Sequence, residues 1–305
     1  MMQIPDTEPR VTATIQVGPK PVGVAVNLHN RVFVTSSSAN LVSVIDTSTN
    51  AVEATADVGF RPESVATDPQ FGVFVANGGD STVSVIDRFN VVIATVNLAG
   101  FPGPLLNSSR VAVDHLMGRA YVTNRSSDRV SILHLGGELP PFAFDFFNVP
   151  GPLGVAVDPM SHRIYVTQPD FDRVSVVDPE TRQVIGTIMV GKQPTSITID
   201  GQRRRAYVVN FGGQTVSAID MTNGGIANTD VGVGPNGITI DALGDVYITN
   251  VDGLVKMIDF VSSSVTDRIP VGSQPTGLAF EPHSNRLYVA NSGDGTVSAI
   301  DLAAH

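Results

Sequence analysis

The chain contains no cysteine and no tryptophan among its 305 residues, and only 16% of its residues are charged. The lack of cysteine excludes disulfides, zinc–thiolate sites, iron–sulfur ligation by thiolates and a cysteine nucleophile. Basic residues are scarce as well, because 19 Lys and Arg stand against 29 Asp and Glu, which gives a net charge of −10. This balance argues against general binding to duplex DNA, whose phosphates are neutralised by Lys and Arg.

Long apolar runs are also missing. No stretch approaches 18 consecutive apolar residues, so no transmembrane segment is expected. The N-terminus begins Met1-Met2-Gln3 and has neither the basic nor the apolar region of an export signal. As it stands, the sequence is typical of a cytoplasmic protein, and its compartment stays open.

What the chain does contain is a repeat. Seven tetrapeptides follow the pattern Tyr-Val-Thr-Asn at intervals of 40 to 47 residues, starting at Phe33, Phe74, Tyr121, Tyr165, Tyr207, Tyr247 and Tyr288. Two further motifs accompany them, Val-Ser-Val-Ile-Asp (first at 42–46) and Pro-Val-Gly-Val-Ala-Val (first at 21–26). Each repeat thus holds four short β-branched runs separated by turn residues. The pattern predicts an all-β, seven-bladed β-propeller with four antiparallel strands per blade.

The two ends of the chain predict a closed ring. The last repeat stops after its third strand, and residues 11–18 match the missing fourth strand. We therefore expect the N-terminal strand to complete the last blade, which removes an exposed sheet edge. The whole chain, 1–305, is predicted to be one domain. Its expected blades cover approximately residues 21–59, 62–100, 108–149, 152–191, 194–232, 235–272, and 275–305 together with 11–18.

These motifs, with a Val-Gly-x-x-Pro linker, resemble the YVTN family of β-propeller repeat proteins over about residues 11–302. The resemblance implies surface-layer, secreted or periplasmic binding proteins, and relatives with propeller domains in redox enzymes and lactonases. The sequence departs from those enzymes, because it lacks a Cys-x-x-Cys-His haem motif. It also lacks a histidine set on the expected binding face, such as streptogramin lyase-like propellers use.

Most repeated polar residues are expected to be structural. The repeated Asn, such as Asn77, is expected to bond nearby backbone in a turn, and the repeated Asp, such as Asp46, to do likewise. Four histidines fall in turns at the rim opposite the binding mouth: His29, His115, His162 and His283. No His pair has metal-site spacing, so neither a metal nor a cofactor is expected.

Candidate site residues are those that break the repeat. The position two residues after the repeated Pro is Gly or Ser in six repeats and Arg110 in the third. The preceding position carries one charged residue, Glu63, in the neighbouring blade. The two are expected to pair, or Arg110 to hold a carboxylate or phosphate bidentately. A plain structural salt bridge is the alternative.

Other cations are expected at the same rim. Arg125 adds a second cation to the third blade, and the linkers between blades add Lys20, Arg61 and Lys192. The predicted ligand-binding set is Arg110, Arg125, Glu63, Arg61, Lys192, Asn236 and Phe211. Such a rim predicts a small anionic ligand or a protein partner, or single-stranded nucleic acid stacked on Phe60, Phe101, Phe171 and Phe211. Dispersed, solvated charges are the alternative.

Two insertions flank the third repeat. One is 101–107, and the other is the run 140–147, in which Phe142, Phe144 and Phe146 are expected to share one face of an outermost strand. This stripe would be an exposed protein contact, or it would pack under the lengthened loop.

Three functions remain open from the sequence. The first is a non-enzymatic binding scaffold. The second is a lyase, isomerase or lactonase acting on a small anionic substrate, with Arg110 and Arg125 binding the anion and Glu63 as general base. The third is binding of single-stranded nucleic acid. An enclosed concavity shared by the two arginines and Glu63 would favour the enzyme, whereas an Arg110–Glu63 pair at a flat rim would favour the scaffold.

Overall fold

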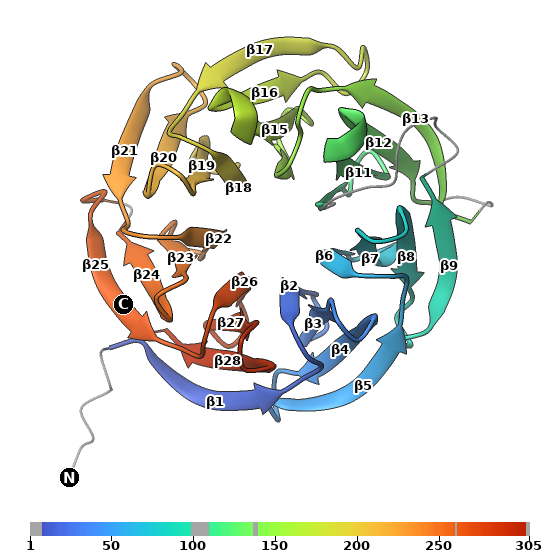
Figure 1. Ribbon diagram of the computed structural model, residues 1–305, viewed down its shortest axis with the longest axis vertical. Coiled ribbons are helices and arrows are strands. Elements are labelled where there is room, and N and C mark those ends of the chain that lie inside the picture. Colours follow the sequence, from blue (N-terminus) through green and yellow to red (C-terminus); the bar gives the residue numbers. More distant parts are fainter. Residues whose placement is uncertain (1–7, 99–109, 137–139, 260, 303–305) are drawn as a thin grey trace.

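The computed structural model describes residues 8–98, 110–136, 140–259 and 261–302. In this part of the chain the strands form seven four-stranded antiparallel sheets, arranged as blades around a central opening (Figure 1). The predicted seven-bladed β-propeller is therefore confirmed. The insertion at 101–107, with Phe101, lies outside the described residues.

The blades follow one another along the chain. The first contains β2 (Pro21–Val26), β3 (Arg31–Ser36), β4 (Leu41–Asp46) and β5 (Ala51–Asp57). The second contains β6 (Pro62–Asp68), β7 (Gly72–Asn77), β8 (Thr82–Ile86) and β9 (Val92–Asn97). The third contains β10 (Val111–Asp114), β11 (Arg119–Asn124), β12 (Arg129–His134) and β13 (Phe142–Asn148), with the 3₁₀ turn η1 (Arg125–Ser127).

The remaining blades repeat this order. The fourth contains β14 (Val155–Val157), β15 (Ile164–Gln168), η2 (Pro169–Phe171), β16 (Arg173–Val177) and β17 (Val184–Met189). The fifth contains β18 (Pro194–Asp200), β19 (Arg205–Asn210), β20 (Thr215–Asp220) and β21 (Ile226–Asp230). The sixth contains β22 (Pro235–Ile240), β23 (Val246–Asn250), β24 (Leu254–Ile258) and β25 (Val265–Pro270). The seventh contains β26 (Pro275–Glu281), β27 (Arg286–Asn291), β28 (Thr296–Asp301) and β1 (Arg10–Gln16).

The ring closes through the N-terminal strand, as the repeat predicts. Strand β1 pairs antiparallel with β28, from Arg10 opposite Asp301 to Gln16 opposite Thr296. Ile15 of β1 is buried and joins a core cluster with residues of the first and seventh blades. Closure therefore covers the edge of β28 and connects the two ends of the propeller.

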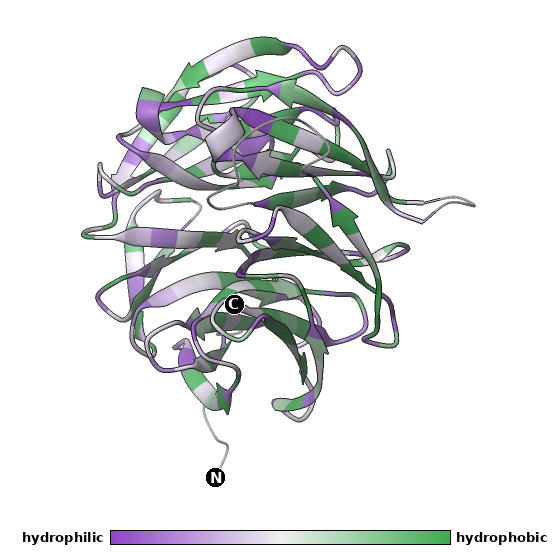
Figure 2. Cartoon of the chain, turned by 45° about the vertical axis from the view of Figure 1, so that its right-hand side comes forward, coloured by the Kyte–Doolittle hydropathy of each residue, from purple (hydrophilic) through white to green (hydrophobic). Residues whose placement is uncertain are grey.

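The hydrophobic core is divided among the interfaces between blades. Tyr121 packs with Ile164 and Val166 of the following blade, whereas its neighbour Val122 packs with Phe74 and Val85 of the preceding blade. Alternation along a strand thus sends consecutive side chains into two different interfaces. Figure 2 shows the hydrophobic segments, in green, along the strands. No helix in the described ranges could span a membrane.

The loops divide between two rims. The mouth rim carries the linkers between blades and the loops from second to third strands; the opposite rim carries the remaining loops. At the mouth rim, Asn77 Nδ2 donates to Thr82 Oγ1 and Ser84 Oγ, both at 2.9 Å. Asn210 and Asn291 repeat this arrangement. Asn291 Oδ1 also accepts the backbone N–H of Gly272 at 3.2 Å, as expected, whereas the partners of Asn77 within the described residues are side chains, because Asn77 lies directly opposite Thr82 in the hairpin.

At the opposite rim, carboxylates hold the turns. Asp46 accepts backbone N–H groups from Ser48 and Thr49, as expected from its turn position. Buried carboxylates also end the inner strands, and the following blade supplies a partner to several of them. Asp158 accepts from Met160 N and Ser161 Oγ within its turn and from Arg204 Nη1 of the next blade at 2.7 Å. These contacts fasten neighbouring blades together.

Candidate anion site at the channel mouth

The central channel is narrow where the inner strands meet, and small residues occupy that level. A Cβ added to Gly154 would lie 2.3 Å from the carbonyl oxygen of Thr195 in the next blade. A Cβ on Gly237 would lie 2.2 Å from the carbonyl oxygen of Thr276. Blades approach one another closely here, which explains why six repeats carry Gly or Ser at this position.

The threonine of the tetrapeptide ties this level together. Thr167 Oγ1 accepts the Gly154 N–H at 2.7 Å and donates to the Thr195 carbonyl at 3.0 Å. Thr123 does the same for the Arg110 N–H and the Leu153 carbonyl. Because these hydroxyls satisfy backbone groups, the wall of the channel is structurally complete without a ligand.

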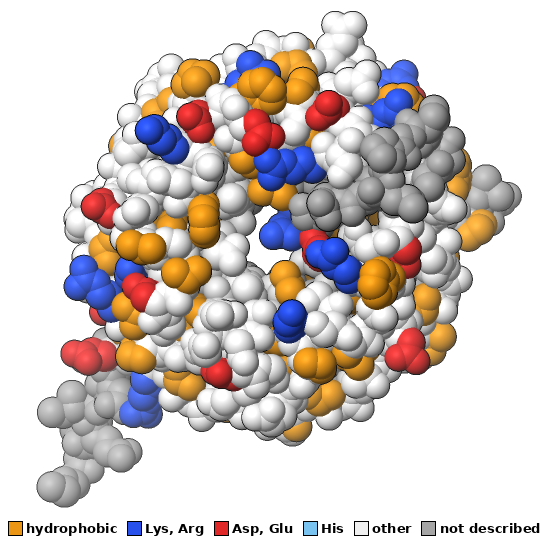
Figure 3. Space-filling model, in the orientation of Figure 1, with side chains coloured by type: hydrophobic (Ala, Val, Ile, Leu, Met, Phe, Trp, Pro, Cys, Tyr) orange, Lys and Arg blue, Asp and Glu red, His pale blue; other side chains and the backbone are white. Residues whose placement is uncertain are grey.

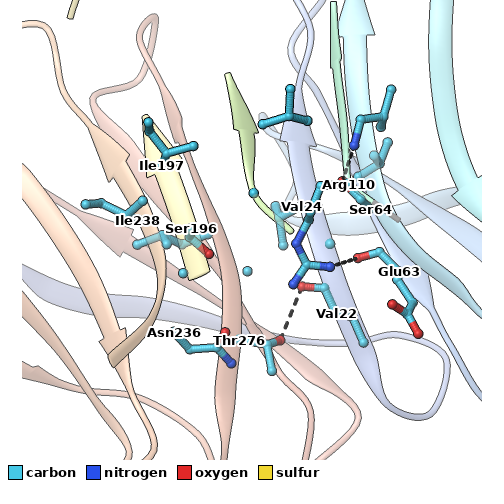
Figure 4. Close-up of a pocket in the computed structure, with 18 residues that line it drawn as sticks. Val22, Val24, Glu63, Ser64, Arg110, Ser196, Ile197, Asn236, Ile238 and Thr276 are labelled. Carbon is cyan, nitrogen blue, oxygen red and sulfur yellow. Dashed lines mark hydrogen bonds between the residues drawn. The ribbon is translucent and has the colours of Figure 1, made fainter. Parts of the chain in front are cut away.

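Arg110 is the exception at this level. Its guanidinium projects into the channel, where Nη1 donates to the backbone carbonyl of Glu63 at 3.4 Å (Figure 4). Burial lowers the pKa of the Arg110 guanidinium, and the negative charge of Glu63 partly opposes this effect. The group stays positively charged, because an arginine side chain does not deprotonate in proteins. Arg110 is therefore a partly desolvated cation, and within the described residues most of its N–H donors have no partner.

The expected ion pair between Arg110 and the Glu63 carboxylate is not formed. The Glu63 carboxylate instead accepts from Arg61 Nη2 at 3.0 Å, so Arg110 contacts Glu63 only through its main chain. Arg61 has a left-handed backbone conformation, with φ +52°, directly before β6, and Glu63 is the second residue of that strand. The carboxylate predicted as a general base is thus hydrogen-bonded to Arg61.

A cavity of about 250 Å³ lies beside Arg110, and its described lining comes from all seven blades. Arg110 and Glu63 line one side, while Ser196, Asn236 and Thr276 lie across from them (Figure 4). Apolar side chains such as Val24 and Ile197 line the cavity as well. The predicted site residues Arg110, Glu63 and Asn236 are thus brought together.

Four predicted residues are not among the lining of this cavity: Arg61, which contacts the Glu63 carboxylate, and Arg125, Lys192 and Phe211. Arg125 Nη2 contacts Asp170 Oδ1 at 2.7 Å, so it does not join Arg110. Lys192 is exposed in a linker, and Phe211 is 45% exposed in a loop of the mouth rim. Figure 3 shows Lys and Arg side chains, in blue, around one side of the central opening, several of them beside acidic groups in red. The enclosed concavity with two arginines that would favour an enzyme is absent from the described structure.

Three histidines contact carboxylates at the opposite rim. His115 Nδ1 lies 3.2 Å from Asp68 Oδ2, and His162 Nδ1 lies 2.9 Å from Asp114 Oδ2, each across a blade boundary. His283 contacts Glu281 of its own blade. Across the described residues, no group of three or more His, Asp or Glu side chains could hold a metal ion.

The aromatic run on β13 divides into two parts. The rings of Phe142 and Phe144 lie 6.3 Å apart and both contact His134. Phe146 lies against the guanidinium of Arg129 instead, at 4.3 Å. The expectation that all three share one face is wrong for Phe146, because a register shift between β12 and β13 interrupts the alternation. Phe142 and Phe144 are about 40% exposed, and a protein contact through them stays a prediction.

One departure from the repeat was not singled out as a site from the sequence. Lys256 replaces the Ser of the third strand in the sixth blade. Its buried Nζ donates to the Val231 carbonyl at 2.8 Å and contacts Asp252 at 3.2 Å. Asn250 bonds the same linker. In other blades the Ser hydroxyl at this position contacts the linker, and here the lysine makes that contact instead. The missing Ser in the motif is the sequence signal for this difference.

Fold and site together define a seven-bladed β-propeller with a polar cavity at the channel mouth, whose described lining includes the Arg110 guanidinium. A scan against protein-family models gives no match, and a search of the curated proteins gives none. The YVTN resemblance therefore rests on the repeated motifs.

Solved structures share the fold. A streptogramin B lyase has a TM-score of 0.79 at 15% identity, covering 99% of this chain and 95% of that one. A catalytically inactive histidine-to-alanine variant of virginiamycin B lyase from Staphylococcus aureus, with quinupristin, has a TM-score of 0.81 at 14% identity. The match covers 97% of this chain and 100% of that one. The Cps50 (Swd1) β-propeller domain of Myceliophteria thermophila has a TM-score of 0.80 at 11% identity, covering 97% of this chain and 100% of that one. Similarity at these identities shows the fold alone.

Proposed function

We propose that this chain is a non-enzymatic, YVTN-type binding propeller whose channel mouth recognises a small anion through Arg110. The observation that carries the proposal is the guanidinium itself. It lies in a cavity of about 250 Å³, and its one hydrogen bond in the described structure is a long contact to a carbonyl. An arginine has five N–H donors, and its fork matches a carboxylate or phosphate.

The surroundings support an anion rather than a second protein group. The nearest carboxylate, Glu63, is already paired with Arg61. Because Glu63 shares its charge with Arg61, it offsets the charge of Arg110 only in part, and partial exclusion of water strengthens the attraction of Arg110 for an incoming carboxylate or phosphate. A cavity of about 250 Å³ has room for a small metabolite or for an inserted part of a partner.

The enzyme alternative finds less support in the site. Arg125 lies outside the cavity and pairs with Asp170, and the Glu63 carboxylate pairs with Arg61. None of the described residues lining the cavity is a histidine, whereas a histidine-to-alanine variant of virginiamycin B lyase is inactive. Single-stranded nucleic acid is less favoured as well, because Arg61 and Arg125 both have acidic partners that reduce their charge towards a phosphate chain.

A thermal-shift screen with small carboxylates and phosphates tests the proposal. Ligands that bind only the folded chain raise its melting temperature, and we expect this for wild type but not for Arg110→Gly. Glycine is the residue of four other blades at this position, so the variant should fold. Arg125→Gly is the matched control, with wild-type shifts expected.

Equal shifts for wild type and Arg110→Gly would contradict the proposal. The same samples separate binding from catalysis. A stabilising anion that is consumed over hours, followed by NMR, would favour the enzyme, whereas a binding protein leaves it unchanged.

A further inference from the structure

We infer that the anion bound at the channel mouth is a small hydroxycarboxylate, with its carboxylate on Arg110 and its hydroxyl groups on Asn236 and Ser196. This inference rests on the proposed function and adds the identity of the ligand class. It comes from polar side chains on the far wall of the cavity, which a simple anion would leave unused.

Asn236 and Ser196 belong to different blades and line the same cavity as Arg110. Figure 4 shows both on the side facing Arg110. Within the described residues, neither side chain has a hydrogen-bond partner. Thr276, by contrast, donates to the carbonyls of Pro21 and Val22, which uses its hydroxyl. The amide and the Ser hydroxyl therefore remain as free donors and acceptors opposite the cation.

Asn236 differs in chemistry from the residues at the equivalent position of the other repeats. The equivalent position in other described blades holds Val22, Glu63, Leu153, Thr195 and Thr276. An amide is unique there, and it can donate and accept at once. A ligand hydroxyl needs such a partner, because it also donates and accepts.

The cavity has room for a short carbon chain. Its volume of about 250 Å³ is many times the roughly 10–15 Å³ that one water molecule needs on the same measure. A three-carbon acid with one or two hydroxyls fits this space. The carboxylate of such an acid matches the guanidinium, and its hydroxyl groups match the amide and the serine. Its short carbon chain matches the apolar side chains between them.

Calorimetric titration with propionate, lactate and glycerate tests the inference, because these acids share a carboxylate and three carbons but differ in hydroxyls. For wild type we expect affinity to rise about fivefold with each hydroxyl, the usual net effect of one hydrogen bond. Asn236→Val and Ser196→Gly use residues from other blades, and each should reduce the gain while propionate binding is unchanged. Arg110→Gly should abolish binding of all three.

Thr195→Val is the matched control. Thr195 is at the position equivalent to Asn236 but is not among the cavity-lining residues, so the hydroxyl gain should be retained. Equal affinity of the three acids for wild type would overturn this inference and leave anion binding standing. Failure of all three acids to bind wild type would count against the proposed function as well. The wild-type series decides the question even where a variant does not fold.

Discussion

Two ion pairs, one at each rim, have the same length and opposite surroundings. Arg204–Asp158 at the opposite rim and Arg125–Asp170 at the mouth rim both have an N–O distance of 2.7 Å. The Asp158 side chain is fully buried, whereas that of Asp170 is 57% exposed. The first fastens two blades together, and the second lies in solvent, where such pairs contribute little.

The comparison extends to the rims as a whole. At the opposite rim, carboxylates are used up by turn N–H groups and by side chains of the next blade, such as His162 and Arg204. At the channel mouth, Arg110, Asn236 and Ser196 keep hydrogen-bonding capacity in a cavity. The same residue types thus stabilise the ring where their bonds are complete, and can serve a ligand where their bonds are not.

The largest effect is expected from opening the ring, on which both rims depend. Deleting residues 1–18 removes β1, exposes the edge of β28 and takes Ile15 out of the core between the first and seventh blades. Burial of one such side chain contributes about 1.5–3 kcal/mol, and the strand pairing adds to it. We expect the melting temperature to fall by about 10 °C or more, measured by calorimetry.

An unchanged melting temperature would mean that β1 does not close the ring in solution. Truncation of residues 1–7, which precede β1, is the matched control and should leave stability as in wild type.

A smaller effect is expected at the two ion pairs. Asp158→Asn removes the charge that binds Arg204, and we expect a loss of about 2–3 kcal/mol in the free energy of unfolding. Asp170→Asn breaks the exposed pair and should change stability by less than about 0.5 kcal/mol. Urea unfolding of both variants measures the difference. Equal losses would remove the distinction between the rims.

Acid provides a second readout of the same variants. Burial would raise the pKa of Asp158, but hydrogen bonds from Ser161, Arg204 and Met160 outweigh it and hold the pKa below its ordinary value. The stabilisation is therefore fully present above the unfolded pKa of about 3.9 and is lost as the pH falls through the lower folded value. The difference between wild type and Asp158→Asn should shrink below about pH 4.

Much of the fold could be predicted from the sequence, because seven in-phase motifs determine strand number, blade order and closure. Arg110 was identifiable too, since it alone breaks a row of Gly and Ser. The other residues of this row have small side chains, because a Cβ added to the glycines would contact the backbone of the neighbouring blade. An alignment of the repeats shows this restriction directly.

Side-chain partners were harder to predict. Glu63 was expected to pair with Arg110 across a blade boundary, but Arg61 reaches it from two residues away. Arg125 is paired with Asp170 of the following blade, 45 residues further along the chain. Such pairings depend on how closely loops of neighbouring blades approach, and a repeat pattern contains no information about that distance.

The most direct test of the channel-mouth site is diffraction from crystals of the wild-type chain soaked in bromide, whose anomalous signal locates anions. We expect the strongest bromide peak inside the channel, within contact of the Arg110 guanidinium, and its loss in Arg110→Gly. A channel without bromide, with the strongest peaks instead at exposed cations such as Lys192 or at the arginines of the opposite rim, would contradict it.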